Sequence, residues 1–250
     1  MLISSILLQL QNVVATSDKA LFQAEKADFL LLPATDIDFP LPADWELVAV
    51  PKRAAMKPVL VALDEQIHFE NFTRKLRIGV FSPLYQKMLE IHFPQVESMC
   101  IYYAENVAFL LEKNDIEGMF LPQFEAEARE LSPYIVQKCS LEVFTPQAAE
   151  GIVFIIGKKG NPLNETVHAS LHHAPTATAC EYEKAFITEM KYHTKSEIFA
   201  YATLFMDTIM MNVGIISENG KAISRQKVET SKGNINSFIK NAVENVLLNK

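Results

Sequence analysis

The chain has 250 residues, of which 49% are hydrophobic and 21% charged, enough for a sizeable core in one large unit or in two to three small domains. A net charge of −7 without a basic stripe argues against a nucleic-acid partner. The apolar start, residues 1–10, lacks a basic segment and is too short to span a bilayer, so we expect a cytoplasmic protein without membrane contact. The cysteines Cys100, Cys139 and Cys180 form no CxxC pair, and free thiols are expected.

Strands and helices alternate along the first two thirds of the chain. Apolar runs predict strands at 28–32, 46–50, 58–63, 75–81, 99–103, 118–121 and 151–157. Helices are expected at 17–26, 84–93, 105–113 and 123–131. Before the second helix, Ser82 suits the N-cap and Pro83 the first turn. This alternation predicts an α/β sheet with right-handed crossovers.

A second kind of region begins at Asn161 and Pro162. Helices are expected at 163–173, 176–192 and 233–248, and strands at 199–205, 208–216 and 222–229. Asn219-Gly220 between the last two strands predicts a two-residue hairpin. The tail therefore reads as a compact α+β domain with a three-stranded antiparallel sheet.

Five strings carry a resemblance through their order and spacing. They are ADFLLLPATDIDFP (27–40), ELVAVPKRAAMKPVLV (46–61), RIGVFSPLYQKMLEIHFPQVE (77–97), PQAAEGIVFII (146–156) and EKAFITEMKYHTKSEIFAYA (183–202). From about Ser17 to the C-terminus the chain resembles the hydroxymethylbilane synthase (porphobilinogen deaminase) family. The first string resembles the family's His-Ser-x-Lys-Asp-x-Pro loop, the third its Gly-Thr-Ser-Ser-x-Arg-Arg segment, and the last its Glu-Arg-x-Phe, Gly-Gly-Cys and Tyr-Ala string.

The resemblance implies an α/β fold of two periplasmic-binding-protein-like lobes that face a cleft, plus a small C-terminal α+β domain. The expected boundaries are 1–62 with 148–160 for a truncated lobe 1, 63–147 for lobe 2 and 161–250 for the third domain. Members of the family condense four porphobilinogen molecules into a linear tetrapyrrole. A dipyrromethane cofactor on a cysteine primes that chain. We expect a monomer whose partner is a small pyrrole or another small ligand.

The residues that this chemistry requires are largely missing. The family's cofactor cysteine falls on Thr194, and an alcohol is a far poorer nucleophile than a thiolate, so no cofactor is expected. Its arginine pair falls on Leu84 and Tyr85, and a further arginine segment on 102–108, which has no basic residue. Residues 1–16 stand in place of the family's first strand, helix and lid.

Asp36 corresponds to the family's catalytic aspartate, at the end of a strand. An exposed turn aspartate that caps the next segment is the interpretation we favour.

Histidines offer one alternative chemistry. His168 and His172 would share a helix face at a usable ligand spacing, but no third ligand accompanies them, and we expect no metal. His193, beside the former cofactor position, is expected to be solvated.

Three hypotheses of function remain open. The first is a hydroxymethylbilane-synthase-like protein of tetrapyrrole biosynthesis that has lost catalysis. The second is an active or weak synthase that uses Asp36 with a non-covalent primer. The third is an unrelated ligand-binding role for a cleft made more apolar by Leu84, Tyr85, Tyr102 and Tyr103.

Overall fold

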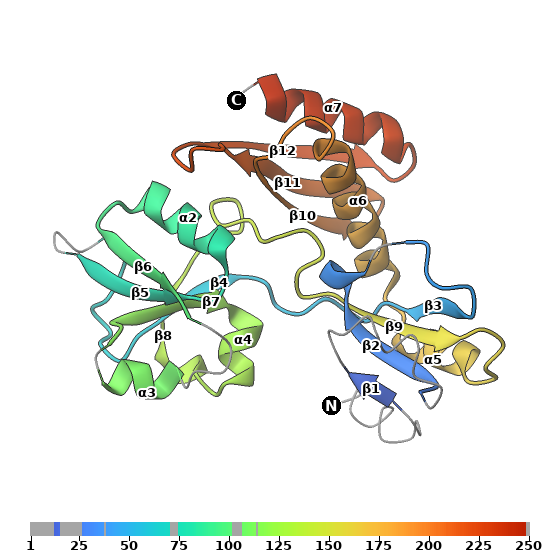
Figure 1. The fold of residues 1–250 in the computed structure, drawn as a ribbon, viewed down its shortest axis with the longest axis horizontal. Coiled ribbons are helices and arrows are strands. Elements are labelled where there is room, and N and C mark those ends of the chain that lie inside the picture. Colours follow the sequence, from blue (N-terminus) through green and yellow to red (C-terminus); the bar gives the residue numbers. More distant parts are fainter. Residues whose placement is uncertain are drawn as a thin grey trace.

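A computed structural model describes residues 13–15, 27–37, 39–70, 75–101, 107–113 and 115–248. The helix predicted at 17–26 and the cleft residues Tyr102 and Tyr103 lie outside these ranges. Figure 1 shows three bodies: two lobes side by side and a third domain that spans both. The predicted fold class, α/β lobes with a C-terminal α+β domain, is confirmed by the three sheets described next.

Lobe 1 is built on a four-stranded sheet with the order β1-β2-β9-β3. Its strands are β1 (Val13–Ala15), β2 (Phe29–Pro33), β3 (Trp45–Ala49) and β9 (Val153–Lys158). β9 runs antiparallel to both β2 and β3, and residues 50–152 separate it from β3 in the sequence. Helix α5 (Asn164–Leu171) packs on β3 through Val167 and Leu171. The predicted start of the third domain at 161 therefore precedes a helix that belongs to lobe 1's sheet.

Lobe 2 is built on a five-stranded sheet with the order β6-β5-β7-β4-β8. Its strands are β4 (Pro58–Val61), β5 (Leu76–Val80), β6 (Val96–Cys100), β7 (Gly118–Pro122) and β8 (Ile135–Lys138). Its helices are α2 (Pro83–His92), α3 (Val107–Glu112) and α4 (Gln123–Ala128).

Lobe 2 corrects several predictions. The boundary expected at 62/63 is wrong, because β4 pairs with β7 and β8 and so belongs to lobe 2. The strand expected at 99–103 lies earlier, at β6, and β8 was not predicted. Ser82 stands at the N-cap of α2, but its side chain makes no capping hydrogen bond.

The third domain packs α6 (Ala174–Met190) and α7 (Ile235–Leu248) on one face of a three-stranded antiparallel sheet. The strands are β10 (Glu197–Phe205), β11 (Thr208–Ile216) and β12 (Ile223–Ser231). The connection after β11 spans six residues, 217–222, so the predicted two-residue hairpin is wrong. Asn219 Oδ1 accepts from the backbone N–H of Lys221, and Gly220 supplies the positive φ of 69°.

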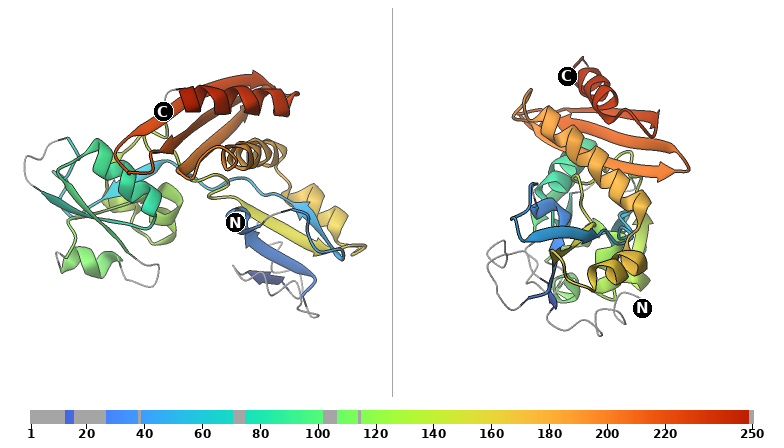
Figure 2. Two further views of the ribbon diagram at one scale, coloured as in Figure 1. Left: turned by 45° about the horizontal axis from the view of Figure 1, so that its top comes forward. Right: turned by 90° about the vertical axis from the view of Figure 1, so that its right-hand side faces the viewer.

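The opposite face of this sheet is part of lobe 2's core. Phe199 and Ile216 are buried with the aromatic cluster around Phe120 and Phe144. Figure 2 shows the third domain above the two lobes, with α6 running from its sheet toward lobe 1. There Cys180 of α6 is buried in lobe 1's core. The third domain is therefore packed against both lobes by apolar contacts.

Candidate functional site

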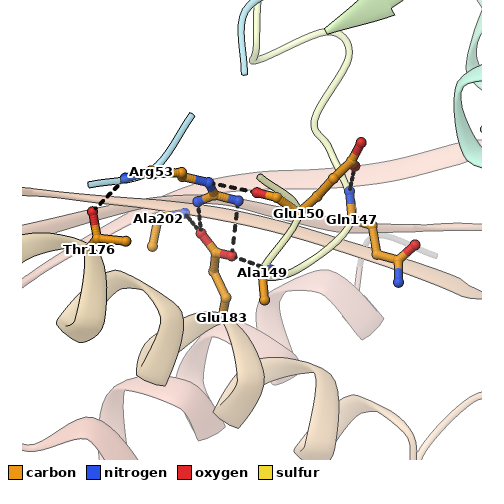
Figure 3. A network of polar contacts seen from close by, with 7 residues as sticks. All are labelled: Arg53, Gln147, Ala149, Glu150, Thr176, Glu183 and Ala202. Carbon is orange, nitrogen blue, oxygen red and sulfur yellow. Dashed lines mark hydrogen bonds and ion pairs between the residues drawn. The ribbon is translucent and has the colours of Figure 1, made fainter. Parts of the chain in front are cut away.

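Two connections join the lobes, the first at 50–57 and the return connection at 139–152. A buried ion pair holds both connections to the third domain (Figure 3). Arg53, on the first connection, donates from its two terminal nitrogens to Glu183 of α6 at 2.5 and 3.3 Å. Glu183 also accepts the backbone N–H groups of Ala149 and Ala202, each at 2.6 Å. Arg53 Nε donates to the carbonyl of Glu150 at 2.9 Å. The Arg53 and Glu183 side chains are 8% and 0% exposed, so water contributes little to their stabilisation.

Two further groups beside this pair have shifted acid–base properties. Burial raises the pKa of Glu150 to about 7, against the opposing effects of a hydrogen bond from Gln147 N and the Arg53 charge. Burial also raises the pKa of Tyr85 well above its ordinary value, and the nearby Glu150 carboxylate adds to the rise. The Tyr85 hydroxyl has no hydrogen-bond partner in the part of the chain that the structure describes. This junction is therefore a buried, partly satisfied polar cluster where both connections meet lobe 2 and the third domain.

A pocket of about 710 Å³ opens next to the junction, where both lobes meet the third domain. Lobe 1 contributes Thr35 and Phe39, and lobe 2 contributes Ser82, Pro83 and Leu84. The remaining lining residues come from the return connection and from the third domain: Gln147, Ala148, Lys184, Ile187, Thr188, Lys191, Thr194, Lys195, Ser196, Glu197 and Ile198. This volume is within the range of small-molecule sites.

The charge that faces the pocket is positive although the whole chain is acidic. Lys184, Lys191 and Lys195 line it, and the one lining acid, Glu197, forms an ion pair with Lys87 of lobe 2. Lys184 is also held by lobe 1, since its Nζ donates to the Ile37 carbonyl and lies 5.5 Å from the Phe154 ring centroid. Such a wall attracts carboxylates or phosphates.

The loop after α6 is fixed by its own hydrogen bonds. The backbone N–H of Thr194 donates to the Met190 carbonyl at 3.1 Å, and Thr194 Oγ1 accepts from Ser196 N at 3.1 Å. The Ser196 hydroxyl is buried and has no partner among the described residues. Thr194, which carries a secondary alcohol, thus lines the pocket at the position where the resemblance puts the cofactor cysteine.

The other predicted site residues are separated by the structure. Leu84 lines the pocket, whereas Tyr85, one residue further around α2, is 1% exposed and packs edge-on against Phe120. The expectation that Tyr85 lines the cleft is wrong, because consecutive helical residues point about 100° apart. Asp36 is half-buried in a 3-10 turn and its Oδ1 accepts from the Thr35 hydroxyl at 2.9 Å, while Thr35 rather than Asp36 lines the pocket.

The histidines on α5 have structural partners. The His168 and His172 rings stack at 4.4 Å. His168 Nδ1 lies 2.7 Å from the Val48 carbonyl, and His172 Nδ1 accepts from Val50 N at 3.3 Å. These contacts require opposite tautomers, so only His168 has an available ring lone pair. In the described ranges no group of three or more His, Cys, Asp or Glu side chains could hold a metal ion.

His193 is exposed and lies 3.5 Å from the Glu189 carboxylate. No helix of the described residues is long and apolar enough to cross a bilayer.

Comparison with known proteins gives one consistent relationship. No protein-family profile matches the chain. The porphobilinogen deaminase of Clostridium botulinum strain Langeland is 24% identical over 205 residues, which cover 81% of this chain and 69% of that protein. The porphobilinogen deaminase of Syntrophotalea carbinolica is 26% identical over 184 residues, covering 73% of this chain and 58% of that protein. The chain is a distant relative of the porphobilinogen deaminases.

A weaker likeness exists among solved structures. An arginine-specific periplasmic binding protein of Salmonella typhimurium matches 70% of this chain and 75% of its own, with 12% identity and a TM-score of 0.32. A score this low adds nothing to the porphobilinogen deaminase relationship.

Sequence reasoning missed the two features that organise the site. Arg53 and Glu183 are 130 residues apart and carry no local signal of pairing. Lys191 and Lys195 are ordinary helix-end and loop lysines in the sequence, and the sequence analysis did not single them out. Comparison of the 183–202 string with the porphobilinogen deaminase motif, residue by residue, could have found these lysines.

Proposed function

We propose that this protein binds an anionic pyrrole compound of tetrapyrrole biosynthesis in the pocket, without a covalent primer and without the family's condensation reaction. The distant relationship to porphobilinogen deaminases supports a function in that chemistry. The loss of catalysis and the identity of the ligand are our inference from the site residues.

The observation that carries the proposal is the position of Thr194. This threonine lines the pocket in the loop where the family's thiol is expected. A primer needs a nucleophile that is substantially ionised near neutral pH, and an unactivated alcohol is not. In the described part of the chain the Thr194 hydroxyl contacts no base, since its recorded partner is the Ser196 N–H, a donor. Ligand would therefore be held by charge and shape alone.

The pocket has both properties that a pyrrole acid requires. Phe39, Pro83, Leu84 and Ile198 present apolar surface for a flat ring, and the lysines present charge for its carboxylates. Asp36 is not among the lining residues, which disfavours the alternative of a working synthase that uses this carboxylate.

The experiment combines intact mass with binding. Purified protein is weighed by mass spectrometry before and after incubation with porphobilinogen, and the affinity for porphobilinogen is measured by calorimetry. We expect saturable binding, an unchanged mass and no consumption of porphobilinogen. A covalent pyrrole adduct or turnover would overturn the loss of catalysis, and no binding would overturn the ligand assignment.

A further inference from the structure

The cations of the pocket all stand on one wall. Lys184, Lys191 and Lys195 belong to α6 and the loop that follows it, whereas neither lobe contributes a lysine or arginine to the lining. The lobe side consists of Thr35, Phe39, Ser82, Pro83 and Leu84. Charge and apolar surface are therefore segregated across the pocket, which a ligand with an acidic edge and a flat apolar body would match.

Two of these lysines are available to a ligand. Lys191 and Lys195 are exposed, and within the described ranges no hydrogen bond or ion pair engages either ammonium group. The two acids nearest in sequence have other partners: Glu189 lies 3.5 Å from His193 Nε2, and Glu197 is paired with Lys87. In the part of the chain that the structure describes, no acid is paired with either ammonium group, and the two lysines flank the turn at Thr194.

A buried hydroxyl in the same loop lacks a hydrogen-bond partner, which is an independent sign that a ligand group binds there. Ser196 is 7% exposed, it lines the pocket, and its Oγ has no hydrogen-bond partner among the described residues. Most buried polar atoms in folded proteins have a partner, so an orphan at a pocket wall is unusual. A change of χ1 rotamer would let this hydroxyl donate to an oxyanion in the pocket.

We propose that loop 191–196 is a carboxylate clamp, in which Lys191, Lys195 and the Ser196 hydroxyl hold the acidic groups of the ligand. The ligand's flat body then lies toward Phe39, whose ring is 53% exposed, and toward Leu84. The assignment of a pyrrole ligand to the clamp rests on the proposed function. The chemistry of the clamp itself requires only a compound with two or more carboxylates.

The experiment uses two probes: porphobilinogen, which has a ring and two carboxylates, and tricarballylate, which has three carboxylates and no ring. Their affinities are measured by calorimetry at 20 and 200 mM NaCl. We expect the double variant Lys191→Gln/Lys195→Gln to bind both probes at least tenfold more weakly and to lose most of the salt dependence. Phe39→Ala is expected to weaken porphobilinogen alone. Lys232→Gln/Lys240→Gln, which removes the same two charges at exposed positions of the third domain, is the matched control and should behave as wild type.

Ser196→Ala separates a ligand contact from a structural role. The variant removes an unsatisfied buried hydroxyl, so its melting temperature should be unchanged or higher, while tricarballylate binding weakens. Unaltered affinity for both probes in the double-lysine variant would overturn the clamp.

The clamp and the proposed function fail separately. Lysine-dependent tricarballylate binding without porphobilinogen binding keeps the clamp and refutes the pyrrole ligand. Porphobilinogen binding that does not change when both lysines are replaced refutes the clamp and keeps the pyrrole ligand.

Discussion

Replacing Arg53 with methionine tests whether the buried ion pair holds the three domains together. The substitution keeps much of the apolar stem but leaves the Glu183 carboxylate, which is 0% exposed, with only two backbone donors. Removing one partner of a buried pair typically costs about 3–5 kcal/mol. For a chain of this size each kcal/mol lowers the melting temperature by roughly 2–4 °C, so we expect a fall of about 6–20 °C at pH 8.

The loss should depend on pH with a defined sign. Burial already raises the pKa of Glu183, and the Arg53 charge opposes that rise, so the pKa climbs further in the variant. A carboxyl whose pKa is raised in the folded state destabilises the fold increasingly as pH rises from its unfolded-state pKa to its folded-state pKa. At low pH, where it is protonated in both states, this destabilisation is absent. The difference between variant and wild type should therefore be smaller at pH 5 than at pH 8.

Thermal unfolding followed by circular dichroism at both pH values measures these differences. Lys227→Met is the matched control, because it removes a cation from the solvent-exposed pair with Glu142 and should leave the melting temperature unchanged. A fall of less than about 2 °C for Arg53→Met at pH 8, where each kcal/mol is worth at least that much, would refute the reasoning. Equal losses at pH 5 and pH 8 would show that the Glu183 charge is not the cause.

The pKa of Glu150 is raised from 4.5 to about 7, so wild-type stability should decline by at most about 3 kcal/mol as pH rises between those values, and Glu150→Gln should flatten that slope in denaturant titrations. Gly214→Ala would place its Cβ 2.2 Å from the Ser224 carbonyl oxygen and should abolish soluble folded protein. Gly160→Ala, at φ +77° with no atom within 4 Å, should cost only the conformational penalty of roughly 1–2 kcal/mol, and similar yields of the two variants would contradict this difference. Native protein should react with a thiol reagent once, at the exposed Cys100, because the other two thiols are buried with pKa values raised to about 12; three equivalents before unfolding would show an open fold.

Much of the fold could be predicted because its signals are local. Runs such as PVLV and VFIIG are apolar on both faces and became the interior strands β4 and β9. The errors have tertiary causes. β8 is polar enough to look like a loop and exists through its pairing with β4. The same pairing places β4 in lobe 2 instead of lobe 1, and the order of the elements along the chain does not reveal it.

The sequence by itself determined the succession of strands and helices, the antiparallel C-terminal sheet and the alcohol at position 194, because side-chain periodicity and chemical identity are properties of short segments. Only the tertiary structure decided that Leu84, itself part of lobe 2's core, also reaches the pocket while Tyr85 does not, since that depends on which side of α2 meets the sheet. It likewise decided that Arg53 meets Glu183 and that the pocket's lysines gather on one wall. Contacts between groups more than a hundred residues apart depend on how the domains pack, and no periodicity in the chain encodes that packing.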